Sequence, residues 1–209
     1  MDKFIAVVDY GLGNLRSVSK ALEGVGAKVS ITNQTQDLAR ASAIVLPGVG
    51  AFQRAMENLT QLNIIPAILT AIKQGKPFLG ICLGLQVLFS QSEEHGQCKG
   101  LGIIPGKVKK FAPGVKIPHM GWNNIKLKIK NEKLKMNLFE NIPDNSYFYF
   151  VHSYYVEPKD KSVIAATTEY ARDFVSAVNK DNIWGVQFHP EKSEKLGLKI
   201  LENFCHGLG

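Results

Sequence analysis

Cys82 lies in a segment whose composition is typical of a nucleophile on a sharp turn. The segment Gly80–Gly84 reads GICLG and directly follows an apolar, strand-like run. In a G-x-nucleophile-x-G elbow, the glycines remove side chains where a strand turns closely into a helix. The sulfur is then exposed at the carboxyl edge of a sheet, where a helix N-terminus favours a thiolate. A lone cysteine at a strand end is usually a small buried hydrophobic residue, and the two glycines favour the nucleophile instead.

His189 and Glu191 supply a base and a carboxylate to orient it. The segment Trp184–Glu191 reads WGVQFHPE, a strand-like run that ends in His. In extended backbone, residues i and i+2 project to one side, about 7 Å apart at Cα. Glu191 can therefore hold the imidazole in one tautomer while the other ring nitrogen faces Cys82. The alternative is a surface histidine followed by a glutamate that starts a helix. Together the three residues predict thiol-based acyl transfer, in a chain order that differs from α/β-hydrolases.

Acyl transfer also needs hydrogen-bond donors for the developing oxyanion. The segment Pro47–Gly50 reads PGVG and follows the strand-like run before it. We expect its backbone to present the N–H groups of Val49 and Gly50 toward Cys82, with the amide of Leu83 as the second donor. The alternative is that the glycines only shape a turn.

The elements that position these residues alternate between strand and helix in the first half of the chain. Short apolar runs are each followed by a Gly or Pro turn and a segment of helical period, which predicts an α/β fold with a doubly wound, mostly parallel, flavodoxin-like sheet flanked by helices. The expected strands are Ile5–Val8, Lys28–Thr32, Ala43–Leu46 (ended by Pro47-Gly48) and Phe78–Cys82, and the expected helices lie at 15–24, 64–72 and Leu85–Phe89.

Beyond about residue 100 the pattern changes to strand-like pieces that predict an additional antiparallel section. These are Trp122–Ile129, Tyr147–Val156, Val163–Thr168, Phe174–Asn179 and Ile183–Phe188, and Leu196, Ile200 and Phe204 then mark a final amphipathic helix. No linker or repeat divides the 209 residues, so we expect a single domain over 1–209.

Composition narrows the function classes. The net charge is +7, with lysines concentrated in Lys107–Lys110 and at Lys126, Lys128, Lys130, Lys133 and Lys135. A solvated lysine face is the expected explanation and an acidic partner the alternative. Arginine occurs only at Arg16, Arg40, Arg54 and Arg172 without interleaved aromatic residues, which argues against nucleic-acid binding.

The cysteines and the N-terminus predict a cytoplasmic protein without membrane contact. Cys82, Cys98 and Cys205 cannot all pair with one another, and none has metal-ligand spacing, so we expect a reducing compartment and no metal. Cys98 and Cys205 lack the elbow and are expected to be structural. The apolar run near the N-terminus is too short for a signal peptide or a membrane span.

A glycine-rich segment near the N-terminus suggests a dinucleotide site but does not match the dinucleotide-binding pattern in detail. Gly11–Arg16 reads GLGNLR after the first strand, but Arg16 occupies the third glycine position. The second strand ends in Thr32-Asn33, without the acidic residue that binds a ribose. We therefore expect no nucleotide cofactor.

The chain resembles the class I glutamine amidotransferases over nearly its whole length, since their triad is Cys, His and Glu in this order. Within that family it is similar to the glutaminase subunits of imidazole glycerol phosphate synthases, and Leu85 agrees with this branch because several sister enzymes carry His there. The segments that carry the resemblance are Val8–Val18, Pro47–Phe52, Gly80–Gln86, Pro118–Asn123 and Val151–Tyr155.

The resemblance implies a chemistry and a set of roles. Cys82 attacks the carboxamide of glutamine, His189 protonates the departing ammonia, and a glutamyl thioester is hydrolysed to glutamate. Gln86 and the segment His152-Ser153-Tyr154 hold the amino-acid end of glutamine, and Gly50 lies near the reacting carbonyl. No cofactor is implied.

The resemblance also implies a partner, a separate (β/α)₈ cyclase subunit in a heterodimer. The cyclase joins ammonia to a phosphorylated ribulosyl intermediate and releases imidazole glycerol phosphate and aminoimidazole carboxamide ribotide in histidine biosynthesis. Glutaminase activity is expected to be weak until the partner docks, with a peptide flip in Pro47–Gly50 as the switch. The alternatives are a paralogue that feeds another acceptor, such as a surface-sugar amidating synthase, a non-catalytic binding subunit, and a cysteine hydrolase of peptides or esters.

Overall fold

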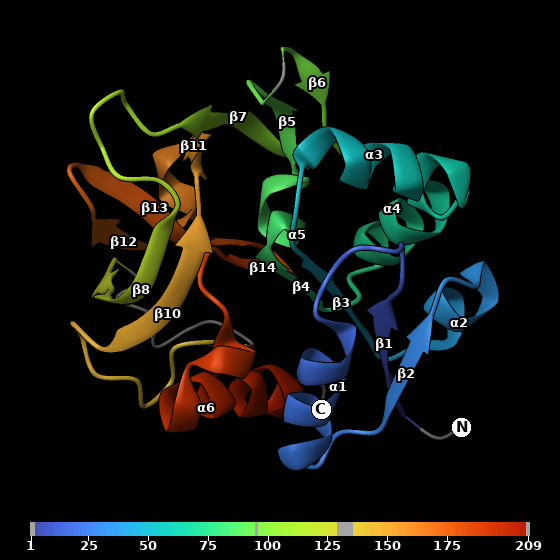
Figure 1. Cartoon of the computed structure of the whole chain (residues 1–209). Coiled ribbons are helices and arrows are strands. Elements are labelled where there is room, and N and C mark those ends of the chain that lie inside the picture. Colours follow the sequence, from blue (N-terminus) through green and yellow to red (C-terminus); the bar gives the residue numbers. More distant parts are fainter. Residues whose placement is uncertain (1–2, 95, 129–135, 208–209) are drawn as a thin grey trace.

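The computed structural model describes residues 3–94, 96–128 and 136–207, and in these ranges twelve strands form one sheet and two form a second (Figure 1). The N-terminal half contains β1 (Ile5–Val8), α1 (Leu15–Gly24), β2 (Val29–Thr32), α2 (Thr35–Arg40), β3 (Ala43–Gly48), α3 (Phe52–Gln61), α4 (Ile65–Lys73), β4 (Phe78–Cys82) and α5 (Leu83–Gln86). Strands β1, β3 and β4 are apolar and buried along their whole length, as parallel strands covered on both faces must be.

The remainder of the chain extends this sheet and adds the small one. Its elements are β5 (Phe89–Ser92), β6 (Cys98–Lys99), β7 (Ile104–Lys110), β8 (His119–Asn124), β9 (Lys126–Leu127), β10 (Tyr147–His152), β11 (Tyr154–Pro158), η1 (Lys161–Val163), β12 (Ile164–Glu169), β13 (Asp173–Lys180), β14 (Ile183–Val186), η2 (Pro190–Lys192) and α6 (Glu194–His206). The large sheet has the order β2-β1-β3-β4-β14-β13-β11-β7-β5-β6; off this path, β12 pairs with β13 and β9 pairs with β12. Strands β8 and β10 pair with each other in the small sheet.

The sheet is parallel from β2 to β14 and antiparallel from β14 through β13 and β11 to β7. The predicted α/β class with an antiparallel section is therefore confirmed. Helices α1 and α6 pack on one face through residues such as Leu22 and Phe204, together with Phe150 of the small sheet. Helices α2, α3 and α4 cover the other face through residues such as Leu59 and Ile68 (Figure 1).

The third strand does not end where the sequence predicted. It continues through Pro47 to Gly48, in register with Ile81 and Cys82 of β4. On its other side β1 pairs only as far as Val45, so Pro47 lies beyond the doubly paired part of the strand, where a missing N–H donor is tolerated. The extension brings the PGVG segment alongside the nucleophile.

The helix predicted at Leu85–Phe89 is wrong in extent. Helix α5 is a single turn from Leu83 to Gln86, and Phe89 already begins β5. Residues 83–89 are buried on every side, so their apolar run carries no helical period that distinguishes helix from strand.

Two predicted strands are also divided or moved. The strand predicted at Tyr147–Val156 breaks at Ser153, so that β10 pairs with β8 while β11 joins the large sheet. The strand predicted at Ile183–Phe188 ends at Val186 and lies parallel beside β4, within the central sheet rather than only in the antiparallel section.

The region predicted as Trp122–Ile129 holds two strands, β8 and the short β9. Ile129 lies outside the described residues, as do Lys130, Lys133 and Lys135 of the lysine-rich segment. Among the helices within the described ranges, none is long and apolar enough to cross a membrane.

Candidate active site

Cys82 occupies a strained backbone position at the end of β4. Its φ of 54° and ψ of −106° lie where non-glycine residues are rarely found. A Cβ on Gly80 would lie 2.7 Å from the carbonyl oxygen of Gly84, and a Cβ on Gly84 would overlap the carbonyl oxygen of Leu46. The elbow therefore closes only with glycine at both positions. Because α5 has a single turn, its dipole is much smaller than the sequence suggested, and its contribution is its free N–H groups.

The sulfur of Cys82 is nearly buried, with the residue 5% exposed. Gln187 Nε2 donates to Sγ at 3.5 Å, and the carbonyl oxygen of Val151 lies 3.9 Å from it. Sγ is thus held between the residue that follows β14 and the strand β10, two segments that are distant in sequence from the elbow.

His189 and Glu191 form a buried pair beside this sulfur. His189 Nδ1 lies 2.8 Å from Glu191 Oε1, and both side chains are at most 2% exposed. Burial by itself would lower the pKa of His189, but the charges and hydrogen bonds of Cys82, when ionised, and of Glu191 raise it to about 10. Beside an ionised Cys82 the imidazole is therefore protonated at neutral pH.

The remaining nitrogen of this imidazole is available for chemistry. Within the described ranges, His189 Nε2 has no hydrogen-bond partner of good geometry, although the Cys82 sulfur is close enough to stabilise its charge. Contacts between catalytic groups are often long in the absence of substrate and shorten in the reacting complex. The arrangement gives a nucleophile, an acid next to it and a carboxylate that fixes the acid.

The local backbone around His189 differs from the expected extended strand. Pro190–Lys192 forms the short helix η2, and this turn, not an extended i to i+2 relation, brings Glu191 back to the imidazole. The backbone N–H of His189 donates to the carbonyl oxygen of Tyr149 at 2.9 Å. Ser193 Oγ donates to the His189 carbonyl at 2.6 Å and accepts from Tyr149 N–H at 3.0 Å. These bonds join the histidine turn to β10.

A cavity of about 420 Å³ opens at the sulfur. This volume suits a small polar molecule. All the residues predicted as oxyanion donors or substrate contacts line it, and the whole lining comes from β4, α5, β10, β11, η2 and the loops between elements. The lining comprises Val49, Gly50, Cys82, Leu83, Gln86, Glu94, Pro118, Val151, His152, Ser153, Tyr154 and Lys192.

The segment Pro47–Gly50 reaches this cavity by an unusual backbone conformation. Gly50 has a φ of 108°, which favours glycine because side chains rarely tolerate it. Gly48 lies directly against the hydroxyl of the buried Tyr10, and a Cβ at that position would overlap it. Both glycines of the PGVG segment are therefore required by the backbone path, whether or not they also bind an oxyanion.

The side chains of Gln86 and His152 are already engaged by the protein. Gln86 Nε2 donates to the Tyr154 carbonyl at 3.0 Å and to Gln187 Oε1 at 3.2 Å. His152 contacts the same carbonyl through Nδ1 at 2.8 Å and His119 through Nε2 at 3.0 Å. Only the Oε1 of Gln86 and the backbone of His152 remain for a ligand.

Sequence reasoning missed Glu94 and Gln187. Glu94 accepts a hydrogen bond of 2.6 Å from the backbone N–H of Phe52, which places its carboxylate in the wall of the cavity. It stands beside Glu93 in a polar stretch after β5, and no spacing distinguishes it from a surface residue. Gln187 lies between Val186 and Phe188 in a predicted strand, where its polar side chain facing the core was the signal available.

Within the described ranges, no three His, Cys, Asp or Glu side chains gather as a metal ion would require.

Comparisons with known proteins identify the family of the chain. A family model described as glutamine amidotransferase class-I matches residues 6–208. Three relatives are each described as imidazole glycerol phosphate synthase subunit HisH. The protein of Moorella thermoacetica is 48% identical, and the match covers 96% of this chain and 93% of that protein. The protein of Aquifex aeolicus is 53% identical, with 95% of this chain and 94% of that protein covered. The protein of Methanocaldococcus jannaschii is 54% identical, with 96% of this chain and 97% of that protein covered.

Solved structures share the fold at low sequence identity. A crystal structure of a glutamine amidotransferase has a TM-score of 0.75 at 16% identity and covers 98% of both chains. The structure of PurLQS from Thermotoga maritima has a TM-score of 0.76 at 20% identity, covering all of this chain and 98% of its own. At such identities the likeness is one of architecture alone.

Proposed function

The chain belongs to the class I glutamine amidotransferase family, and we propose that it hydrolyses glutamine to glutamate and ammonia for the cyclase subunit of an imidazole glycerol phosphate synthase, in histidine biosynthesis. The relatives named as subunits of that synthase support this acceptor over a different one, such as a surface-sugar amidating synthase. The observation that carries the chemistry is the Cys82 sulfur at the cavity floor beside a protonated His189 fixed by Glu191.

The proposed reaction begins with attack of the Cys82 thiolate on the carboxamide carbon of glutamine. The carbonyl π electrons move to oxygen, and the N–H groups of Leu83 and of Val49 or Gly50 stabilise the resulting oxyanion. His189 donates its Nε2 proton to the nitrogen as the C–N bond breaks, so ammonia leaves and a glutamyl thioester remains. The neutral imidazole then takes a proton from water, whose oxygen displaces the sulfur and releases glutamate.

The cavity wall suits the α-amino-acid end of glutamine. The Glu94 carboxylate uses one hydrogen bond on the Phe52 N–H and can pair with the α-ammonium group. Gln86 Oε1 and the backbone of Ser153 and Tyr154 offer further polar contacts in the same cavity. A residue inside a peptide chain, or a simple carboxylic ester, lacks the free ammonium group that Glu94 would bind, which separates this proposal from a general cysteine hydrolase.

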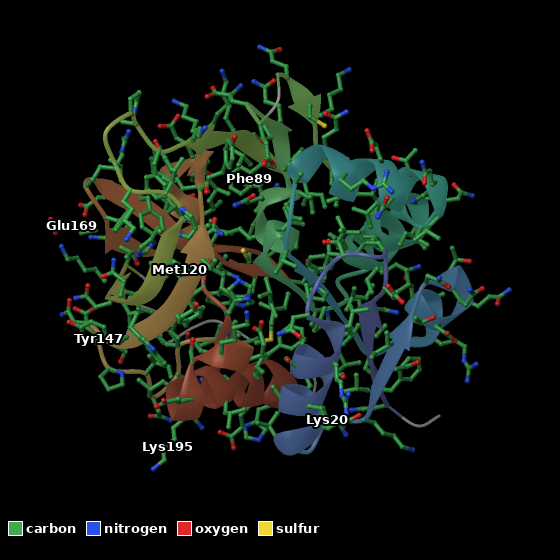
Figure 2. All side chains as sticks on the ribbon, in the orientation of Figure 1. Lys20, Phe89, Met120, Tyr147, Glu169 and Lys195 are labelled. Carbon is green, nitrogen blue, oxygen red and sulfur yellow. The ribbon has the colours of Figure 1, made fainter. Side chains whose placement is uncertain are left out.

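We place the docking surface for the cyclase on the small sheet. Its exposed apolar residues Met120, Trp122 and Tyr147 are 63%, 47% and 58% exposed, and Figure 2 shows Met120 and Tyr147 on β8 and β10. Exposed aromatic residues and methionine are enriched at protein interfaces. The same sheet supplies cavity residues Val151 and His152, so a partner on this face would cover the site.

The assembly that we propose is a heterodimer with a (β/α)₈ cyclase, whose lyase reaction uses the ammonia. A cytoplasmic location fits a nucleophile that must stay reduced, and Cys82, Cys98 and Cys205 are all free thiols. The oxyanion segment Pro47–Gly50 is the proposed switch, since turning one of its peptides would add or remove a donor.

The test is a glutaminase assay of the chain alone and with its cyclase and the cyclase's nucleotide ligand. We expect glutamate release to rise strongly in the complex. Cys82→Ala should abolish glutamine use while added ammonium still supports product formation by the cyclase. A wild-type complex that releases no glutamate, or a Cys82→Ala complex that still uses glutamine, would contradict the proposal.

A further inference from the structure

A continuous chain of hydrogen bonds runs from the small sheet toward the sulfur. It begins at Asn123 on β8, whose Nδ2 lies 3.2 Å from His119 Nε2. His119 Nδ1 lies 3.0 Å from His152 Nε2, and His152 Nδ1 lies 2.8 Å from the Tyr154 carbonyl oxygen. Four residues of β8, β10 and β11 are thereby joined in series across the break at Ser153.

The chain continues from this carbonyl to the nucleophile. Gln86 Nε2 donates to the same Tyr154 oxygen at 3.0 Å and to Gln187 Oε1 at 3.2 Å. Gln187 Nε2 in turn donates to Cys82 Sγ at 3.5 Å. The Tyr154 carbonyl is therefore the point where the histidine branch meets the amides that border the cavity.

The donor and the acceptor of each hydrogen bond follow from the chemistry of the two groups that it joins. A carbonyl only accepts, so His152 Nδ1 must carry the hydrogen. In a neutral imidazole the other nitrogen then accepts, so His119 Nδ1 must donate to His152 Nε2. By the same rule His119 Nε2 accepts from the amide of Asn123. A single tautomer of each histidine satisfies the whole series.

Burial keeps both histidines in these neutral tautomers. His119 is 4% exposed and His152 is 5% exposed. Burial lowers the pKa of His119 to about 4, and burial, offset in part by the Tyr154 carbonyl, lowers that of His152 to about 3. The His119 ring is also stacked between Tyr170, at 4.0 Å between centroids, and Phe150, at 5.0 Å.

We propose that His119 and His152 are positioning residues for glutamine binding: their paired hydrogen bonds fix the Tyr154 carbonyl and, through it, the Gln86 amide and the Ser153–Tyr154 wall of the cavity. The inference deepens the proposed function and rests on it. All four ring nitrogens of the pair have partners within the protein. The pair also joins the sheet that carries the docking surface to the side chains around Cys82.

Two substitutions at His119 separate hydrogen bonding from packing. His119→Phe keeps an aromatic ring between Tyr170 and Phe150 but removes both nitrogens. His119→Asn removes the ring but keeps an amide N–H near the position of Nδ1, from which it can still donate to His152. The measurement is KM for glutamine and kcat of the complex with cyclase, because KM does not depend on the fraction of folded enzyme.

We expect His119→Phe to raise KM about tenfold, the effect of one lost buried hydrogen bond, with a much smaller change in kcat. His119→Asn should restore a KM within about threefold of wild type, and ammonium-dependent product formation should be the same in all three proteins. A wild-type KM in His119→Phe would overturn the inference, as would an equal rise in both variants, which indicates ring packing. Absence of glutaminase activity in the wild-type complex would instead contradict the proposed function.

Discussion

Replacing Glu191 with Gln removes one charge from the buried pair and keeps an oxygen for His189 Nδ1. In the wild type, the Cys82 thiolate and Glu191 together overcome the burial that lowers the pKa of His189 and raise it to about 10. Two unit charges at about 4 Å interact by about 4 kcal/mol at an effective dielectric constant of 20, or about 3 pKa units. The substituted amide keeps the hydrogen bond to Nδ1, and the charge of Glu191 is the smallest of the contributions that raise the pKa of His189. We therefore expect this pKa to fall by less than the full charge interaction, by about 1 to 2 units.

The lower pKa of His189 changes the dependence of kcat/KM on pH. The imidazolium is the acid for ammonia release, so kcat/KM decreases as pH rises through the pKa of His189. We expect the basic limb of the profile, measured on the complex, to move from near pH 10 to lower pH by the same 1 to 2 units in Glu191→Gln. The exposed carboxylate of Glu202, paired with Lys199 on α6, provides the control Glu202→Gln, which should leave the limb unchanged. An unmoved limb in Glu191→Gln would refute the assigned electrostatics of the triad.

Three further predictions concern the elbow, the cavity and the histidine pair. Gly84→Ala forces a Cβ into the β3 backbone and should lower the free energy of unfolding, measured in urea, by about 3 kcal/mol or more. In the control Gly24→Ala the added Cβ meets no atom within 4 Å, so this substitution should be neutral or stabilising. Glu94→Gln keeps the acceptor for the Phe52 N–H but loses its charge, so KM for glutamine should rise at least about tenfold, and an unchanged KM would remove Glu94 from ammonium binding. His119 has a pKa of about 4 in the folded protein, against 6.5 for an unperturbed histidine. As pH falls through this window the unfolded chain binds the proton first, so the free energy of unfolding decreases. In His119→Phe the slope of unfolding free energy against pH should be smaller by about 1.4 kcal/mol per pH unit, and a slope equal to that of the wild type would contradict the burial of His119 as a neutral ring.

The sequence predicts the elements whose patterns are local. The strands at Ile5–Val8 and Phe78–Cys82 and the amphipathic helix that ends near His206 are found where their apolar runs and glycines place them. The elbow is predictable because its steric requirement for glycine is itself local. Helix α3 carries a readable signal too, with Phe52, Ala55 and Leu59 on one buried side, although its polar majority obscures it.

Features set by tertiary contacts could not be predicted from local sequence patterns. The break at Ser153 separates two strands of similar composition, and only their different partners, β8 and β7, distinguish them. Glu191 reaches its histidine through the turn of η2, which WGVQFHPE does not specify. Glu94 enters the cavity because it binds the N–H of Phe52, 42 residues away.

In the proposed reaction, Cys82 supplies the sulfur that attacks glutamine. The modified residue can be identified directly by mass-spectrometric mapping of the complex after treatment with an electrophilic glutamine analogue. We expect one label per chain, on Cys82, with Cys98 and Cys205 unmodified and glutamate release lost in proportion. Loss of activity with Cys82 unlabelled, or label on another cysteine, would contradict the account.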